Sequence, residues 1–319
     1  MVSPFLADSL KRGLPRFDLH IKAPLLGPFA EYAKHYGLAT LVEQHAAFYG
    51  WGKLEAYGYD IAVQAFLPPG KAKGTLLVLH GYFDHVGLFT HLIQRGLERG
   101  YAVVAYDLPG HGLSSGAPCD IEDFAHYQEV LRDVLAALKP EMPGPWVAVG
   151  QSTGGSILLD NVLQSIQAGQ RPVFARVQLW APLVRPAQWR KVRFGYSLLS
   201  TFKREVPRHF RSSSQDPAFL DFLWHHDPLQ HRQIPLQWLG SMIRWEAHMA
   251  AMPPCRYPVS LVQGDQDETV DWRFNTAYVR SHTFVEGYVE VAGAAHHLAN
   301  EREDLRTQCL AALDRYLLI

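Results

Sequence analysis

The sequence has few cysteines, almost no net charge and no long apolar run. The three cysteines, Cys119, Cys255 and Cys309, lie far apart and form no C-x-x-C pair, which argues against a disulfide framework or a zinc site and for a reducing compartment. The 30 basic and 31 acidic side chains nearly cancel, so no global charge attracts the chain to nucleic acid. No segment approaches the ~18 uninterrupted apolar residues that a membrane span requires.

The N-terminal stretch MVSPFLADSLKRGLPRF also lacks the features of a secretory leader. Asp8, Lys11 and Arg12 interrupt it before an apolar region can form, and no basic region precedes that point. Together with the cysteine usage, this predicts a cytoplasmic location.

What the sequence does contain, from about Leu54 onward, is an alternation of short apolar runs and longer helical patterns. The stretch KLEAYGYDIAVQAFLP alternates like a hairpin around Gly58, and further runs are typical of buried strands: GTLLVLHG, YAVVAYDLPG, PWVAVGQ, FARVQLWAP, YPVSLVQGD and YVEVAGAAH. Between the earlier runs, apolar residues recur every three or four positions, as in amphipathic helices: HVGLFTHLIQRGLERG, IEDFAHYQEVLRDVLAALKP and STGGSILLDNVLQSIQAG. This order predicts an α/β fold with a mostly parallel sheet flanked by helices.

Two regions break the alternation. Residues 1–49 precede the sheet and contain helical stretches around 29–36 and 38–48, so they predict an N-terminal helical extension. Residues 185–254 show no clear strand, whereas a crossover normally needs only ~10–15 residues. Because this insertion interrupts an otherwise regular pattern, we expect a helical cap over a core formed by residues 50–184 and 255–319.

One predicted strand ends in a G-x-S-x-G pattern, which comprises Gly150, Gln151, Ser152, Thr153 and Gly154. A serine on a sharp, strained turn needs neighbours without Cβ atoms, and the helix that follows directs free N–H groups toward the hydroxyl. An ordinary strand-to-helix turn softened by glycine would give the same letters. The placement between strand and helix favours a nucleophile.

A serine hydroxyl needs an adjacent base, which in turn needs an orienting acid. Ligands collect at the carboxyl ends of the strands in open α/β sheets, so the candidates are the polar residues that follow later strands. The candidate acids are Asp265, Asp267, Glu268 and Asp271, and the candidate bases are His296 and His297. The order serine, acid, histidine is the one expected for this architecture.

The tetrahedral intermediate of acyl transfer also requires preorganised N–H donors. The stretch LLVLHGYFDH ends an earlier strand with His80 and Gly81, which allow the backbone to turn so that the Tyr82 amide faces the nucleophile. The Thr153 amide is the second expected donor of this oxyanion hole. His80 is expected to pin the loop by hydrogen bonds and to take no part in catalysis.

In this order and at this spacing, the stretches HGYFDH, YDLPGHGLSSG, GQSTGG, VQGDQDETV and GAAHHLANE resemble the α/β-hydrolase superfamily. Within it they are most similar to the lysophospholipase and monoacylglycerol lipase branch. The resemblance runs from about Leu54 to the C-terminus and includes the cap, where WHHDPLQ and CRYPVSLVQGDQD are similar to that branch's junction of cap and strand. It implies a serine hydrolase that needs no cofactor or metal.

The resemblance also selects among the candidate residues. The acid of the branch lies in a G-x-x-D pattern, which implies Asp267, with Val270 packing inward beyond it. The base lies in G-A-x-H, which implies His296. Asp265 is then expected to stabilise its turn, and His297 to begin the last helix.

One departure from the pattern of the branch is expected to leave the mechanism intact. Many relatives carry methionine where this chain has Thr153, but only the backbone amide is required there, so the difference concerns the shape of the pocket.

In YDLPGHGLSSG, Asp107 and His111 are expected to be structural because the triad is complete without them and turn-forming residues surround them.

The cap carries apolar and aromatic side chains at helical spacing in two segments, 194–202 and 236–245. Such stripes usually pack on the domain beneath. The alternative is that they line an acyl-chain tunnel or touch a bilayer, with RKVR and KREVPRHFR on anionic headgroups. The residues assigned to substrate binding are Phe83, Gln151, Phe194 and Trp238.

These observations predict a serine hydrolase that cleaves carboxylic esters of monoacylglycerol- or lysophospholipid-like lipids through an acyl-enzyme on Ser152. A short-chain carboxylesterase or thioesterase is the alternative, and a perhydrolase, amidase or acyltransferase stays open because all share the acyl-enzyme step. The alternative from another class is a catalytically silent protein that binds lipid or a membrane surface. We expect a lipid or small-molecule ester as the partner, no nucleic acid, and peripheral contact with an anionic membrane as an open alternative.

Overall fold

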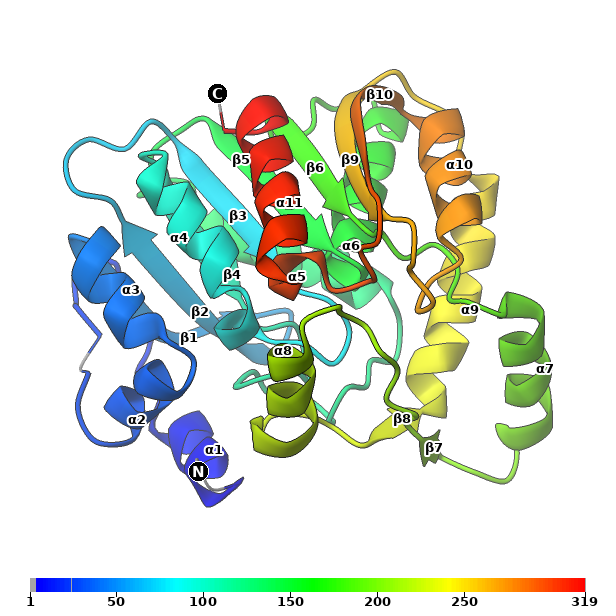
Figure 1. Cartoon of the computed structure of the whole chain (residues 1–319), viewed down its shortest axis with the longest axis horizontal. Helices are drawn as coiled ribbons and strands as arrows, with labels where there is room; N and C mark the ends of the chain where they lie inside the picture. The colour runs from blue at the N-terminus through cyan, green and yellow to red at the C-terminus, as the bar shows by residue number, and fades with distance from the viewer. Residues whose placement is uncertain (1–3, 24, 319) are drawn as a thin grey trace.

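A mixed eight-stranded sheet forms the centre of the computed structural model, which describes residues 4–23 and 25–318 (Figure 1). Its strands are β1 (Phe48–Ala56), β2 (Tyr59–Leu67), β3 (Thr75–Leu79), β4 (Ala102–Tyr106), β5 (Trp146–Gln151), β6 (Arg176–Trp180), β9 (Pro258–Gly264) and β10 (Phe284–Val291). They lie in the order β1-β2-β4-β3-β5-β6-β9-β10. Strand β2 is antiparallel to β1 and β4, and the pairs from β4 to β10 are parallel. The predicted α/β fold is confirmed.

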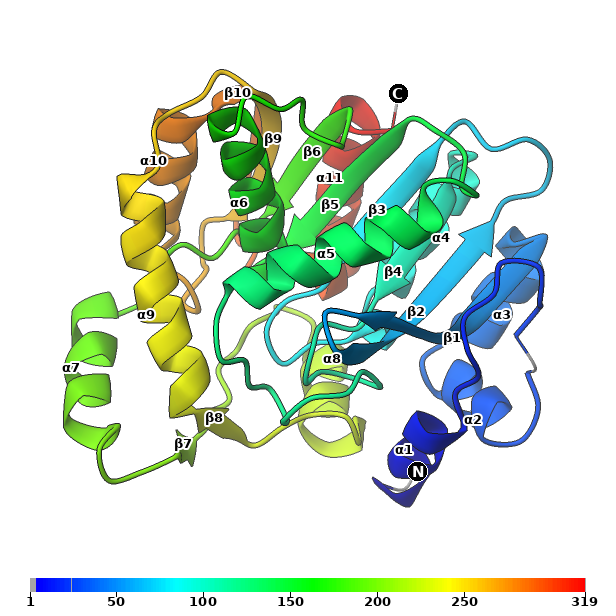
Figure 2. The same ribbon diagram turned by 180° about the vertical axis from the view of Figure 1, so that it is seen from behind.

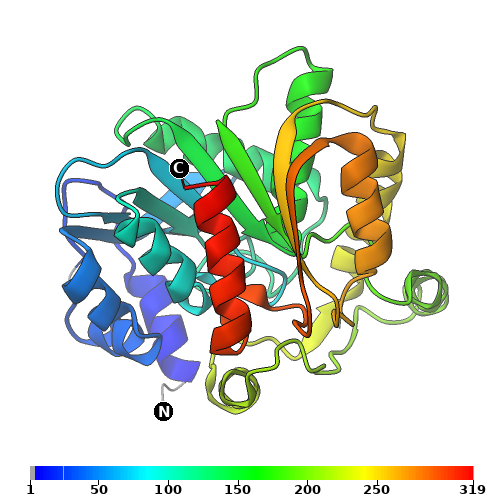
Figure 3. The same cartoon turned by 45° about the horizontal axis from the view of Figure 1, so that its top comes forward.

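Helices cover both faces of this sheet. Those that connect or follow the strands are α4 (Thr90–Glu98), α5 (Ala125–Leu138), α6 (Thr153–Gln167), α10 (Trp272–His282) and α11 (Glu303–Tyr316), with the 3-10 turns η1 (Val86–Leu88) and η3 (Leu298–Asn300). Helices α5 and α6 lie on one face (Figure 2), and α11 lies along the face that also carries α4 (Figure 3).

The alternation of side chains along the central strands explains the two layers. In β3, Leu77 and Leu79 belong to the core that contains the α5 and α6 side chains, whereas Leu76 and Val78 belong to the core beneath α4 and α11. Successive residues of a strand point to opposite faces of a sheet. A strand that is apolar at every position therefore requires a helical layer on each side.

The first hairpin turns where the sequence predicts. Ala56 pairs with Tyr59, and the two residues between them have positive φ values, 47° at Tyr57 and 76° at Gly58. This backbone matches a two-residue turn of the type that suits the twist of antiparallel strands. Strand β1 begins at Phe48, earlier than the alternation from Leu54 indicates.

The helices before the sheet pack on its outer strands. Helices α2 (Pro28–His35) and α3 (Leu38–His45) match the predicted stretches, and α1 (Pro4–Gly13) adds a helix that the sequence analysis did not identify. The rings of Phe29 and Tyr32 lie 5.1 and 4.7 Å from that of Trp51 in β1. The division at residue 49 between an extension and a core stays a prediction.

In the view of Figure 1, the insertion between β6 and β9 lies below the sheet and to its right. It contains α7 (Trp189–Leu199), β7 (Glu205–Pro207), α8 (Pro217–Asp221), the π-turn η2 (Phe222–His226), β8 (Gln233–Pro235) and α9 (Leu236–Ala251). Strands β7 and β8 pair antiparallel over three residues each, which is too short to give an alternating pattern. None of the helices in the described ranges is long and apolar enough to cross a bilayer.

Candidate active site

Ser152 stands on a sharp turn between β5 and α6. Its φ of 53° and ψ of −116° lie outside the regions that residues with a Cβ atom normally adopt. A Cβ atom on Gly150 would lie 2.4 Å from the carbonyl carbon of Gly154, and one on Gly154 would lie 2.4 Å from the carbonyl oxygen of Leu79. Each of the two positions therefore needs a glycine, because a Cβ atom there would overlap the backbone of Gly154 or of Leu79.

Backbone hydrogen bonds hold the turn in this conformation. The Ser152 amide donates to the carbonyl of Trp180 at 2.9 Å, and its carbonyl accepts from the amides of Leu183 at 3.1 Å and Ser156 at 3.0 Å. The neighbouring strand β6 thus fixes the position of the serine. Ser152 lines a cavity that His296 also lines.

Asp267 and His296 form a hydrogen-bonded pair at the ends of β9 and β10. His296 Nδ1 donates to Asp267 Oδ2 at 2.7 Å, and Gln263 Nε2 donates to the same oxygen at 3.2 Å. The other carboxylate oxygen accepts from the amides of Thr269 at 2.8 Å and Val270 at 3.1 Å. The carboxylate is thereby held in one orientation, and Val270 is buried as predicted.

Burial and charge shift the pKa values of this pair in opposite directions. Burial alone would lower the pKa of His296, but the charge of Asp267 and its hydrogen bond outweigh this and raise the pKa above 6.5. Burial alone would raise the pKa of Asp267, but the charge and hydrogen bond of His296 and the amides of Thr269 and Val270 lower it overall. The carboxylate therefore stays ionised beside the imidazole.

The side chain of Asp265, the alternative acid, bonds the backbone of a neighbouring loop. Its Oδ1 accepts from the Gly293 amide at 2.7 Å, which joins the loop after β9 to the loop after β10. This contact agrees with the turn-stabilising role expected from the sequence.

The loop after β3 lies directly beside the nucleophile. A Cβ atom on Gly81 would lie 2.7 Å from Asp84 Oδ2 and 3.1 Å from Ser152 Cβ, so the backbone that leads to Tyr82 approaches the serine closely. His80 Nε2 accepts from the Leu108 amide at 2.9 Å, and its Nδ1 donates to the Gly81 carbonyl at 2.7 Å. His80 thus pins this loop to the next one, in agreement with the structural role expected for it.

Ser152 and His296 face a cavity of about 410 Å³, a size typical of small-molecule sites. Its apolar wall includes Val192, Tyr196, Leu199, Trp238, Leu239 and Met242 of α7 and α9. Phe83 and Trp238, both assigned to substrate binding, line it. The Tyr82 ring stacks on Trp238 with centroids 3.7 Å apart, which joins the loop after β3 to the insertion. Within the described residues, no group of three or more His, Cys, Asp or Glu side chains could hold a metal ion.

Two of the four residues assigned to substrate binding lie elsewhere, which corrects that assignment. Gln151 is buried, and its Oε1 accepts from the Ala299 amide at 3.0 Å, so it faces η3 and not the cavity. Phe194 is 66% exposed because it lies on the outer side of α7, whereas the next residues, Gly195 and Tyr196, line the cavity. The side chain of Thr153 is buried outside the cavity lining.

His297 also differs from expectation. It precedes η3 and not the last helix, which begins at Glu303. Its Nε2 lies 3.3 Å from Asp84 Oδ1, and both side chains line the cavity. Burial would raise the pKa of Asp84, but His297, His80 and Arg208 lower it overall. The sequence analysis missed this pair, although its residues lie in the quoted stretches HGYFDH and GAAHHLANE.

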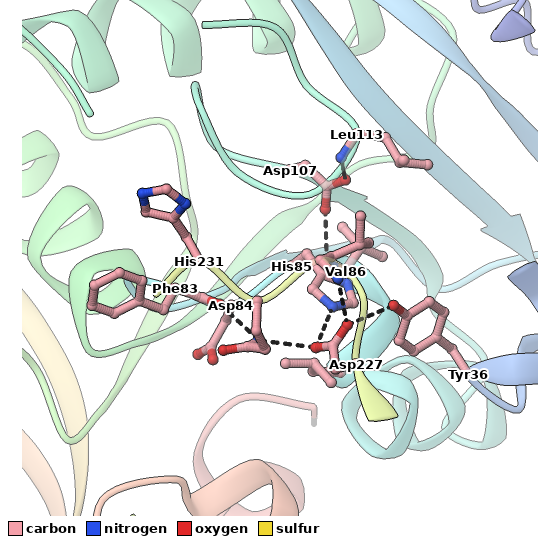
Figure 4. A network of polar contacts seen from close by, with 12 residues as sticks. Tyr36, Phe83, Asp84, His85, Val86, Asp107, Leu113, Asp227 and His231 are labelled. Carbon is pink, nitrogen blue, oxygen red and sulfur yellow. Dashed lines mark hydrogen bonds and ion pairs between the residues drawn. The ribbon is translucent and has the colours of Figure 1, made fainter. Parts of the chain in front are cut away.

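A second buried network, shown in Figure 4, joins three distant parts of the chain. His85 Nε2 lies 3.0 Å from Asp227 Oδ2, and the Tyr36 hydroxyl donates to Asp227 Oδ1 at 2.7 Å. Gln230 Nε2 donates to Asp227 Oδ2 at 2.9 Å and to the Phe83 carbonyl at 3.0 Å. These bonds tie the insertion to the loop after β3 and to the end of α2.

The loop after β4 is held by the residues that the sequence analysis kept out of the triad. Asp107 accepts from the amides of Val86 at 2.7 Å and Leu113 at 2.8 Å (Figure 4). His111 Nδ1 donates to the Pro109 carbonyl at 2.9 Å. Both side chains bond backbone groups, in agreement with the structural role expected for them, and His111 Nε2 is buried without a hydrogen-bond partner among the described residues.

Comparisons with known proteins show the family of this chain and several named relatives. The family described as serine aminopeptidase, S33, matches residues 70–303. Monoacylglycerol lipase of Mycolicibacterium smegmatis is 30% identical over 102 residues, which cover 32% of this chain and 36% of that lipase. Monoglyceride lipase of Mus musculus is 29% identical over 233 residues, 68% of this chain and 73% of the mouse protein. A phospholipase of Bacillus subtilis is 25% identical over 264 residues, 76% of this chain and 95% of its own length.

Solved structures share the fold at lower identity. A soluble variant of monoglyceride lipase from Saccharomyces cerevisiae, in complex with a substrate analogue, superposes with a TM-score of 0.69 at 16% identity, over 83% of this chain and 92% of its own. Monoacylglycerol lipase from Paleococcus ferrophilus gives a TM-score of 0.67 at 18% identity, over 82% and 98%. The chain therefore belongs to the α/β-hydrolase enzymes of the serine aminopeptidase, S33, family.

Proposed function

We propose that this serine hydrolase cleaves carboxylic esters with Ser152 as nucleophile, His296 as general base and Asp267 as the acid that orients the base. The observation that carries the proposal is the 2.7 Å hydrogen bond from His296 Nδ1 to Asp267 Oδ2, on a histidine that shares a cavity with the strained Ser152.

The hydrogen bond determines which nitrogen can act as the base. An ionised carboxylate only accepts hydrogen bonds, so the proton of a neutral His296 resides on Nδ1. Nε2 is then unprotonated and able to take the hydroxyl proton of Ser152. Ser152 Oγ attacks the ester carbonyl, and the protonated His296 gives its proton to the departing alcohol. Water, activated by the same histidine, then releases the carboxylic acid.

The oxyanion of the tetrahedral intermediate needs donors that are already in place. The Thr153 amide is the first of α6 and has no carbonyl to bond within the helix. The Tyr82 amide follows Gly81, whose backbone lies beside Ser152. We assign these two amides to the oxyanion hole.

The substrate that fits best is a lipid ester of the monoacylglycerol or lysophospholipid type. The apolar side chains of α7 and α9 give the cavity a wall suited to an acyl chain, and relatives are named monoglyceride lipase and phospholipase.

Peripheral contact with an anionic membrane is part of this proposal. Phe194, Leu198 and Phe202 are 66%, 54% and 88% exposed on and after α7, beside the basic Arg190 and Arg193.

A panel of esters with varied chain length tests the proposal. Monoacylglycerols, lysophospholipids and p-nitrophenyl esters are hydrolysed by the wild type and by Ser152→Ala as control. We expect a sharp optimum of kcat/KM at long acyl chains and loss of activity in the variant. Activity confined to short esters or thioesters would replace the lipid substrate with the short-chain alternative. An active Ser152→Ala variant would overturn the mechanism.

A further inference from the structure

Arg208 is a cation that lines the cavity and forms no ion pair within 4.0 Å among the described residues, although the charge of Asp84 acts on it from farther away. It follows β7 and lines the cavity. Its Nη1 donates to Gln230 Oε1 at 2.8 Å and to the His231 carbonyl at 3.2 Å. Among the residues that the structure describes, no carboxylate oxygen lies within 4.0 Å of its guanidinium, and no acceptor bonds its Nε or Nη2. Two of its three nitrogens therefore have no hydrogen-bond acceptor among the described residues.

The guanidinium is held in a fixed plane. Its Cζ atom lies 3.9 Å from the centroid of the Phe83 ring and 4.4 Å from that of Phe210. Gln230, which accepts from Arg208, also donates to the Phe83 carbonyl at 3.0 Å. Burial lowers the pKa of Arg208 to about 10, so it stays charged at neutral pH. Such preorganisation reduces the entropy lost when a ligand binds.

The charge balance of the cavity is positive. Its lining includes the permanent cations Lys191, Arg208 and Arg211, whereas Asp84 is the one acidic side chain among its described lining residues. Asp84 is already paired with His297 at 3.3 Å. This single carboxylate acts on both His297 and Arg208 and cannot neutralise three cations. A planar guanidinium suits the two-pronged binding of phosphate or carboxylate.

The position of Arg208 indicates which part of an ester it would meet. It covers Phe83, the residue after Tyr82 in the loop beside Ser152, whereas the apolar side chains of α7 and α9 form another wall of the cavity. An ester with its carbonyl at Ser152 would place its acyl chain along the apolar wall. Its alcohol portion would then lie toward Arg208.

We propose that the alcohol portion of the substrate carries an anionic group, a phosphate or a carboxylate, and that Arg208 binds it. This inference rests on the proposed ester hydrolysis and narrows its substrate class from monoacylglycerol- or lysophospholipid-like esters to esters whose alcohol portion is anionic. It assigns Arg208 as the residue that determines the preference for the alcohol portion.

The test compares lauroyl esters that differ in the alcohol alone: 1-lauroylglycerol, 1-lauroylglycerol 3-phosphate and lauroylglycerate. We expect kcat/KM to be higher for at least one anionic ester than for the neutral one. We expect Arg208→Gln to lower the ratio of anionic to neutral kcat/KM by roughly 10- to 100-fold, and Arg208→Lys to lower it less. The matched control is Arg232→Gln, because Arg232 also stacks on Phe210, at 4.7 Å, but lies outside the cavity lining; its ratio should match the wild type.

A binding measurement separates failure of this inference from failure of the proposed function. The ether 1-dodecylglycerol 3-phosphate, which has no ester to cleave, is titrated calorimetrically into the wild type, Arg208→Gln and Arg232→Gln. Weaker binding to Arg208→Gln alone supports the anionic site, even if no ester is hydrolysed. Equal binding to all three proteins overturns it, as does an unchanged ester ratio in Arg208→Gln. The anion that gives the larger preference identifies phosphate or carboxylate as the group bound.

Discussion

Replacing Asp267 by asparagine changes one charge and leaves the size of the side chain unaltered. The two carboxylate oxygens accept four hydrogen bonds, from His296, Gln263 and the amides of Thr269 and Val270. An asparagine NH₂ group cannot face the two backbone amides without leaving both unsatisfied in a buried site. It must therefore face His296, which then accepts at Nδ1 and carries its proton on Nε2.

With the proton on Nε2, the imidazole can no longer take the proton of Ser152. We expect kcat for a p-nitrophenyl ester to fall on the order of 10⁴-fold, as the same change does in another Ser-His-Asp triad. This fall corresponds to about 5 kcal/mol of transition-state stabilisation. The pKa of His296 should also fall, because burial would continue to lower it and the charge of Asp267 would no longer raise it.

The assay is a pH–rate profile of kcat/KM for the wild type, Asp267→Asn and Asp265→Asn. Asp265 is the matched control because it lies two residues away and bonds the Gly293 amide. Its variant should stay within a few-fold of the wild type. A variant Asp267→Asn that loses less than tenfold in kcat, or an acid limb that does not move to lower pH, would refute the reasoning.

Three further predictions follow from the contacts. In the wild type, activity should fall as the pH drops through a pKa above 6.5, because His296 must be neutral to act as base and its pKa is raised; an acid limb below pH 6 would contradict this. Gly154→Ala should lower the free energy of unfolding in urea by about 1–3 kcal/mol or more, because its Cβ would lie 2.4 Å from a carbonyl oxygen, whereas Gly195→Ala, with no atom within 4 Å, should lose nothing. Tyr36→Phe should destabilise the protein by about 1–3 kcal/mol in the same assay, because the buried Asp227 loses a hydrogen-bond donor; equal stability would mean that this bond contributes nothing.

The elements that could be predicted are those whose pattern lies within a few consecutive residues of the sequence. Strands β5 and β9, which precede Ser152 and Asp267, are mostly apolar, whereas β10, which precedes His296, contains Glu286 and Glu290 and is largely not buried. All three end before turn-forming residues, so their carboxyl ends could be predicted. The glycines around Ser152 also have a local cause, since each permits a close backbone approach within the same turn or to β3. The oxyanion and triad roles stay predictions that the proposed experiments address.

The features that sequence analysis missed depend on contacts between distant residues. Tyr36 and Asp227 lie 191 positions apart, and His85 and Asp227 lie 142 apart, so no spacing in the sequence connects them. Phe194 was assigned to the cavity because the apolar period of α7 does not determine which side of the helix faces the core. Gln151, the last residue of β5, bonds the amide of Ala299, which lies 148 positions away, so no local pattern predicts where its side chain points.

The most direct test of the central claim is to locate the nucleophile chemically. The folded wild-type protein is treated with a fluorophosphonate, and the modified peptide is identified by mass spectrometry. We predict one adduct on Ser152, abolished in Ser152→Ala and strongly slowed in His296→Ala. An adduct on another residue, or equal labelling of Ser152→Ala, would contradict the account.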